Sequence, residues 1–130
     1  MSTLFTKIIN GEIPSYKVAE DENFYAFLDI NPLERGHTLV VPKIEVDYIF
    51  DMESKQLASF NLFAQRVAKA IDKSIDCKRV GIAVIGLEVA HAHIHLIPLH
   101  QDAINFSKKK LNLQKEQFLS IAKAISNNFI

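Results

Sequence analysis

The stretch from His91 to Pro98 constrains this chain more than any other, because three histidines alternate there with small or apolar residues. Alternation is the period of a β-strand, whose successive side chains point to opposite faces. The intervening apolar residues are therefore expected to pack on a core, with the imidazoles of His91, His93 and His95 in a row on the opposite face. Such a row needs a chemical reason, since buried imidazoles each need hydrogen-bond partners.

Three explanations of the row compete. A half-buried strand with a chance histidine face is the simplest, but three of the chain's five histidines lie within five residues. A metal site is the second; His91 and His95 would lie about 13 Å apart on a straight strand, so a further ligand must come from elsewhere. Catalysis fits best. With a pKa of about 6.5, one imidazole can attack phosphorus, a second can fix its tautomer and a third can donate a proton.

The histidine pattern resembles the signature of the histidine triad (HIT) family of nucleotide hydrolases and transferases. Three further blocks carry the same resemblance: Leu-Phe-Thr-Lys-Ile-Ile-Asn-Gly-Glu-Ile-Pro at 4–14, Phe-Leu-Asp-Ile-Asn-Pro at 27–32, and Gly-His-Thr-Leu-Val-Val-Pro-Lys at 36–43. The resemblance covers residues 3 to about 100, and the blocks together are far more specific than any one alone.

The resemblance implies an α+β fold with a five-stranded antiparallel sheet, a short N-terminal helix, a long helix and a C-terminal helix. We expect a single domain over residues 1–130, with a HIT-like core at about 3–100 and a C-terminal helical extension at about 101–130. The family usually pairs this sheet into a homodimer, so a second copy of the chain is the expected partner.

Periodicity places the individual elements. A stripe of apolar residues predicts the long helix at 54–75, with Ser54 as N-cap. Shorter amphipathic patterns predict helices at 3–10 and around 118–125. Strands are expected at 16–19, 24–30, 38–41 and 79–85 and through the triad. Because 79–85 is apolar on both faces, we expect it at the centre of the sheet.

By the same resemblance the substrate is a purine nucleoside 5′-phosphoramidate or a related AMP- or GMP-containing derivative. His93 is expected to attack the α-phosphorus and form a nucleotidyl-histidine intermediate. His91 would orient His93, and His95 would contact the phosphoryl oxygens or protonate the leaving group. No cofactor and no metal are expected, because a row of imidazolium groups would itself supply positive charge. A nucleotide-binding module with little turnover and a metal-dependent hydrolase stay open as alternatives.

The resemblance also assigns nucleotide contacts to Phe5, Ile8, Phe27, Asp29, Ile30, His37, Gly86 and Glu88. Phe5 and Ile8 would line a base pocket, although plain core packing explains them equally well. Asp29 could accept hydrogen bonds from two ribose hydroxyls or could cap the turn that follows it. His37 is either a satisfied surface residue or a neighbour of the active site.

The chain departs from the family pattern at several positions. Some members carry Cys-x-x-Cys as half of a structural zinc site where this chain has Thr3 and Thr6. Glu45 stands where many relatives have a further histidine, and an ionised carboxylate can accept a proton but not donate one. Glu88 stands where many relatives have a Ser or Thr that contacts phosphate; a hydrogen bond to an imidazole such as His91 is an alternative role. Residues 107–110 are expected to form a solvated loop.

Charge and composition exclude several classes of protein. Fifteen basic and fifteen acidic residues cancel, which leaves no electrostatic basis for binding nucleic acid or a membrane surface. The single Cys77 excludes an intrachain disulfide and fits a reducing compartment. Since neither a signal peptide nor a membrane span is recognisable, we expect a cytoplasmic protein. The physiological substrate, the preferred base and the role of the last helix are not determined by the sequence.

Overall fold

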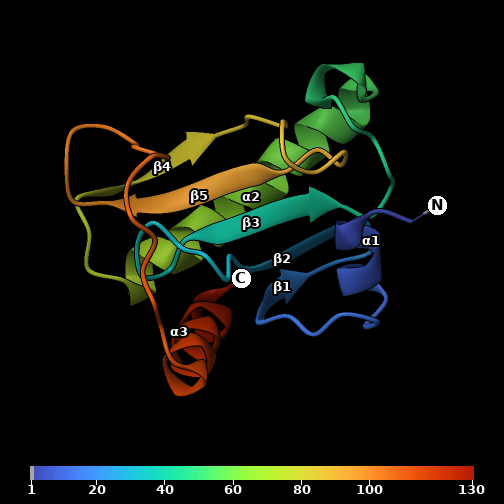
Figure 1. Cartoon of the computed structure of the whole chain (residues 1–130). Helices are drawn as coiled ribbons and strands as arrows, with labels where there is room; N and C mark the ends of the chain where they lie inside the picture. Colours follow the sequence, from blue (N-terminus) through green and yellow to red (C-terminus); the bar gives the residue numbers. More distant parts are fainter. Residues whose placement is uncertain (1) are drawn as a thin grey trace.

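The computed structural model describes residues 2–130, and its elements follow the expected order closely (Figure 1). The strands form one antiparallel sheet in the order β1-β2-β3-β5-β4, which confirms the predicted α+β architecture. In chain order the elements are α1 (Leu4–Ile9), β1 (Lys17–Glu20), β2 (Phe24–Leu28), β3 (Thr38–Pro42), a short 3-10 turn (Ile49–Asp51), α2 (Ser54–Ser74), β4 (Arg79–Ala83), β5 (Ile94–Leu99) and α3 (Lys115–Asn128).

The two faces of the sheet carry different partners, and β2 shows why. Its residues alternate, so Phe24 and Leu28 point into the main core while Tyr25 and Phe27 point to the other face. Helices α2 and α3 cover the first face, and α1 lies at the opposite face (Figure 1). The smaller cluster under α1 includes Phe5, whose ring contacts the triad residues His91 and His93.

Helix α2 provides most of the main core because its apolar residues recur on one stripe. Phe60, Val67 and Ile71 are fully buried there, each contributing about 1.5–3 kcal/mol relative to exposure. The predicted N-cap was wrong by one residue: Glu53 is the N-cap and makes no side-chain capping bond, while Ser54 is already helical.

Helix α3 belongs to the same core as α2 and the sheet. A capping box between Gln114 and Gln117 starts the helix, because each side chain satisfies the other residue's free N–H. Phe118 stacks on Tyr16 with ring centroids 4.8 Å apart, and Ile125 is fully buried. The C-terminal segment therefore completes the domain core beside β1.

Two expectations about the strands were wrong. Strand β4 was expected at the centre of the sheet but lies at its edge, where it pairs only with β5. Ile82 of β4 is therefore 58% exposed. The triad strand begins later than predicted: β5 starts at Ile94, so only His95 belongs to it, and His91 and His93 lie in the segment that enters it.

Among residues 2–130, no helix combines the length and apolar character that crossing a membrane requires.

Candidate active site

The three triad histidines occupy three different environments. His91 is completely buried, His93 is 5% exposed, and His95 is half-buried on β5. The ring of Phe5 makes edge contacts with both His91 and His93, at centroid distances of 5.6 and 5.0 Å. The rings of His93 and His95 are 5.0 Å apart. Helix α1 is thus packed directly against the first two histidines.

His93 is held in one tautomer by the backbone. Its Nδ1 lies 2.8 Å from the carbonyl oxygen of His91, and a carbonyl only accepts, so Nδ1 carries the proton. In the neutral ring the lone pair is then on Nε2. No hydrogen bond within residues 2–130 occupies that nitrogen, so Nε2 is available as a nucleophile. The orientation expected from the His91 ring is supplied by the His91 backbone instead.

His95 is held in the other tautomer by a chain of two hydrogen bonds. The backbone N–H of Leu33 donates to Nδ1 of His37 over 3.0 Å, which leaves the His37 proton on Nε2. That proton points at Nδ1 of His95, 2.9 Å away. His95 must accept there, so its own proton is on Nε2. His37 is 2% exposed and lies beside the triad, as one of its two sequence interpretations required.

Both ring nitrogens of His91 bind protein. Nε2 donates to the carbonyl oxygen of Pro42 over 2.7 Å, and Nδ1 lies 2.6 Å from Oγ1 of Thr3. No nitrogen of His91 is left for a substrate. The hydrogen bond suggested between Glu88 and His91 was wrong, because both positions on the ring are taken and Glu88 is exposed to solvent.

Burial keeps the rings neutral. Desolvation lowers the pKa of His37 to about 3 and that of His95 to about 4, and it lowers the pKa of His91 as well. The imidazolium charge expected on His91 and His95 is therefore absent in the ligand-free protein at neutral pH. These rings act as oriented hydrogen-bond donors and acceptors.

Two cavities meet at the triad. The smaller, of about 230 Å³, is mostly apolar and lies under α1; the larger, of about 560 Å³, lies toward the segment between β5 and α3. Their walls share Asp29, Asn31, Glu88, His93 and His95. A ligand that filled both cavities would place its central part at this junction, next to Nε2 of His93.

The smaller cavity contains most of the residues expected to bind a base. Phe5, Ile8, Phe27 and Ile30 line it, with Ile30 64% exposed. Phe5, Ile8 and Phe27 are also members of the second hydrophobic cluster, so core packing and pocket lining coincide. Gly86 lines neither cavity; its φ of +79° accounts for the glycine as a turn residue.

Asp29 takes one of its two predicted roles, the cap of the turn, and its place in the cavity walls is compatible with the other. Its Oδ1 accepts from the N–H of Asn31 over 2.8 Å, which caps the turn, while Oδ2 lies 3.6 Å from Nε2 of His37. Asp29 lines both cavities, so its carboxylate has acceptor capacity left for ligand hydroxyls. Burial is the largest cause that raises the pKa of Asp29, and the neighbouring Glu88 raises it further.

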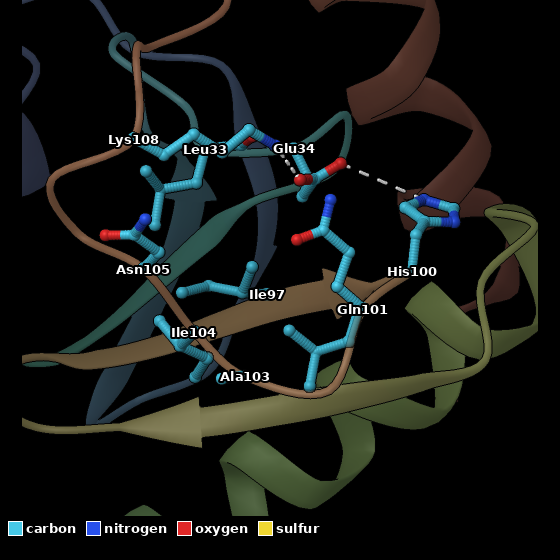
Figure 2. A pocket seen from close by; sticks show the side chains of 10 residues that line it. Leu33, Glu34, Ile97, His100, Gln101, Ala103, Ile104, Asn105 and Lys108 are labelled. Atoms are coloured by element: carbon cyan, nitrogen blue, oxygen red, sulfur yellow. Dashed lines mark hydrogen bonds and ion pairs between the residues drawn. The ribbon is translucent and has the colours of Figure 1, made fainter.

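The segment between β5 and α3 closes the larger cavity, and sequence reasoning missed it. Phe106 packs edge-on against His95 at 5.0 Å, and Lys110 lines the cavity while its Nζ donates to the Phe106 carbonyl. Lys108 donates to the carbonyl of Leu33 and pairs with Glu34 (Figure 2). Residues 107–110 form a loop, as expected, and all but Lys108 are exposed; the prediction did not foresee the contacts that Lys108 and Lys110 make. The sequence did offer one signal for this segment, because it directly follows the triad strand.

Among residues 2–130, one cluster of side chains brings three possible metal-ligand atoms together. Asp29, His37 and His95 place these atoms within 4.8 Å of one another. However, the Leu33 N–H donates to Nδ1 of His37, so Nε2 carries a proton and has no lone pair for a metal. The cluster as built is a hydrogen-bond chain and does not suit a metal ion.

Comparison with known proteins decides the family. A family model described as the HIT domain matches residues 10–102. The chain belongs to the HIT domain family. An uncharacterized HIT-like protein of Borreliella burgdorferi is 40% identical, with 96% of each chain covered. The adenosine 5′-monophosphoramidase HNT1 of Saccharomyces cerevisiae is also 40% identical, over 73% of this chain and 61% of the yeast protein.

Solved HIT structures share the whole architecture. A Hit-like protein of Bartonella henselae superposes with a TM-score of 0.84 at 30% identity, covering 98% of this chain and 96% of that one. A zinc-bound histidine triad protein of Mycobacterium smegmatis gives 0.82 at 29% identity, covering 99% and 94%. The predicted HIT fold is thereby confirmed, and these matches extend over the C-terminal helix that the sequence blocks did not reach.

Proposed function

We propose that this HIT protein hydrolyses purine nucleoside 5′-phosphoramidates through a nucleotidyl-His93 intermediate. The observation that carries the proposal is the unprotonated Nε2 of His93 at the junction of the two cavities. A nucleoside in the apolar cavity would place its α-phosphorus beside that nitrogen. Its base would contact Phe5 and Ile8, and its ribose hydroxyls would donate to Asp29.

The chemistry follows from the tautomers. Nε2 of His93 forms a bond to phosphorus as the bond from phosphorus to the leaving nitrogen breaks. The leaving nitrogen, protonated from solvent, departs with the bond pair as an amine. Nε2–H of His95 donates to a phosphoryl oxygen, since its proton faces away from His37. Water then attacks phosphorus, the electron pair returns to His93, and a nucleoside monophosphate is released with one proton.

The charge at the junction supports an amine as the leaving group. Glu88 lies in the walls of both cavities, beside His93. A departing phosphate would carry negative charge past this carboxylate, whereas a departing amine is neutral or positive. The yeast relative is named an adenosine 5′-monophosphoramidase, which supports the same substrate class.

The direct experiment is release of AMP from adenosine 5′-phosphoramidate. Binding of AMP without any turnover would favour the nucleotide-binding module instead. Glu88→Ser should raise kcat/KM for a dinucleoside polyphosphate about tenfold relative to the phosphoramidate, if the carboxylate repels anionic leaving groups. Glu22→Ser, at an exposed turn, is the matched control and should leave the ratio unchanged.

The mechanism assigns no role to a metal. The Mycobacterium smegmatis relative is zinc-bound. In this chain the cluster around His37 is held by hydrogen bonds, and Thr3 and Thr6 offer hydroxyls, which are poor zinc ligands. Treatment with EDTA should leave the rate unchanged. Loss of activity that Zn²⁺ restores would revive the metal-dependent hydrolase.

We also propose a homodimer formed through β4. This edge strand exposes Ile82, and the segment after it exposes Ile85 and Leu87, which is 89% exposed. An apolar antiparallel edge is a template for pairing with a second copy. Sedimentation at micromolar concentration should show twice the 14.7 kDa chain mass, and Ile82→Lys should shift the species to the monomer.

A cytoplasmic location is the remaining proposal, supported by the free thiol of Cys77. Cell fractionation with an antibody against the chain would test it. Recovery outside the cytoplasmic fraction would contradict it.

A further inference from the structure

Three residues that depart from the family pattern meet at one point of the structure. Oγ1 of Thr3 lies 2.6 Å from Nδ1 of His91 and 3.2 Å from Oγ1 of Thr6. The backbone N–H of Thr3 donates to Oε1 of Glu45 over 3.0 Å. Hydrogen bonding from the Thr6 hydroxyl and from the Thr3 N–H lowers the pKa of Glu45. The network joins the start of α1, the segment after β3 and the triad.

The direction of the central hydrogen bond follows from the ring of His91. Its Nε2 donates to the Pro42 carbonyl, so the neutral ring has its lone pair on Nδ1. The hydroxyl of Thr3 must then give its single proton to Nδ1 over 2.6 Å, in preference to the longer 3.2 Å contact with Oγ1 of Thr6. The Thr3 oxygen is still free to accept from the N–H of Thr6, which is the N-cap bond of α1. One hydroxyl therefore caps the helix and satisfies a buried imidazole.

The contacts that fix His91 also fix the orientation of the nucleophile, His93. The carbonyl oxygen of His91 accepts the Nδ1 proton of His93, so the orientation of this peptide decides which nitrogen of His93 is free. With both ring nitrogens of His91 bonded, to Pro42 and Thr3, the residue cannot rotate without losing a buried hydrogen bond.

Glu45 has a supporting role in the same network. Thr3 is the N-cap of α1 and has extended backbone, so its N–H has no partner within the helix. The bond from its N–H to the exposed Glu45 carboxylate fixes this residue to the segment after β3.

We propose that Thr3 is a positioning residue for catalysis, that it acts on the nucleophile His93 through His91, and that Glu45 secures Thr3 in place. This role goes beyond the proposed function and rests on it for the kinetic readout only. It also joins α1 to both halves of the site, because Phe5 of the same helix lines the base cavity and touches His93. Where some relatives have a zinc-binding Cys-x-x-Cys, this chain uses hydroxyls.

The test compares Thr3→Val with Thr3→Ser. Valine keeps the shape but loses the hydroxyl, so kcat should fall about tenfold, the rate equivalent of one lost hydrogen bond. KM for the nucleotide should change less, since Thr3 lines neither cavity beside the triad. Serine keeps the hydroxyl and should restore the rate. Side-chain ¹⁵N NMR should show the His93 proton confined to Nδ1 in the wild type and Thr3→Ser, and shared between both nitrogens in Thr3→Val.

Two controls separate positioning from plain stability. Gln114→Ala removes the cap of α3, far from the triad, and should lower stability while leaving kcat and the His93 tautomer unchanged. Glu45→Ala should lower kcat a few-fold, and adding it to Thr3→Val should cost no more, since both act through one contact. Asp47→Ala, an exposed acid in the same segment, should have no effect.

An unchanged His93 tautomer in Thr3→Val, or a rate loss in Thr3→Ser equal to that in Thr3→Val, would overturn the proposal. So would additive losses in the double variant. The NMR readout needs no turnover. A wild-type protein that lacks phosphoramidase activity would therefore contradict the proposed function, while the tautomer would still decide the role of Thr3.

Discussion

The two ends of the triad are built alike and serve opposite purposes. His91 and His95 are both neutral rings held by hydrogen bonds from residues far away in the chain. At the His91 end, Thr3 and Pro42 take both nitrogens, and the ring is completely buried. At the His95 end, His37 takes only Nδ1, and the Nε2–H faces the cavities.

The difference shows how a repeated residue acquires separate roles. A histidine with both nitrogens bonded to protein supports the fold, while one with a single nitrogen bonded keeps the other for a ligand. His93 lies between them; its Nδ1–H donates to the backbone carbonyl of His91, and the lone pair on Nε2 is free.

His93→Ala should abolish turnover of the phosphoramidate, a loss on the order of 10³-fold or more, because it removes the nucleophile. AMP binding should persist, since the base and ribose contacts do not involve this ring. Mass spectrometry of a quenched wild-type reaction should find the nucleotidyl group on His93. An adduct on His91 or His95 in its place would contradict the assignment of all three rings.

His95→Ala should lower kcat by about 10²-fold, the usual loss for one donor to a phosphoryl or oxyanion oxygen. His95→Gln keeps an N–H donor and should recover part of the rate. Because His37 holds the His95 proton on Nε2, we expect similar losses for good and poor leaving groups. A loss confined to poor leaving groups would show that His95 protonates the leaving nitrogen instead.

Asp29→Asn should weaken AMP binding by roughly 1.5–3 kcal/mol, the value of a hydrogen bond to a charged group. The size of the side chain is kept, but charge-assisted acceptance from the ribose is lost. Calorimetry with AMP and with its 2′,3′-dideoxy analogue separates the two roles of Asp29. Equal weakening for both ligands would assign the residue to the turn at Asn31 alone.

The thermal midpoint should fall by at least about 4 °C between pH 6.5 and pH 5. His37 and His95 stay neutral in the folded state because burial lowers their pKa to about 3 and about 4, while the unfolded chain takes up protons below about 6.5. The unfolded state then binds more protons, so stability falls as the pH falls. His37→Phe should flatten this slope; an unchanged slope would mean that folding does not lower the pKa of His37.

Local sequence patterns predicted the helices and strands but not which strands lie next to one another in the sheet. The apolar stripe of α2 and the alternation of β2 were read correctly, because period and burial depend on residues close in sequence. Strand β4 was misplaced at the centre of the sheet. A strand with apolar residues on both faces can lie at the centre of a sheet or at its edge, and the sequence does not distinguish the two positions.

Alternation and motif spacing lie along the chain, so they were enough to predict the family, the fold class and the three histidines. Which nitrogen of each ring is free depends on contacts that form only in the folded protein. Thr3 reaches His91 across 88 residues and His37 reaches His95 across 58, and such hydrogen bonds exist only once the sheet has formed. Burial in that sheet also lowered the pKa of His91 and that of His95, so these two rings are neutral where imidazolium groups were expected.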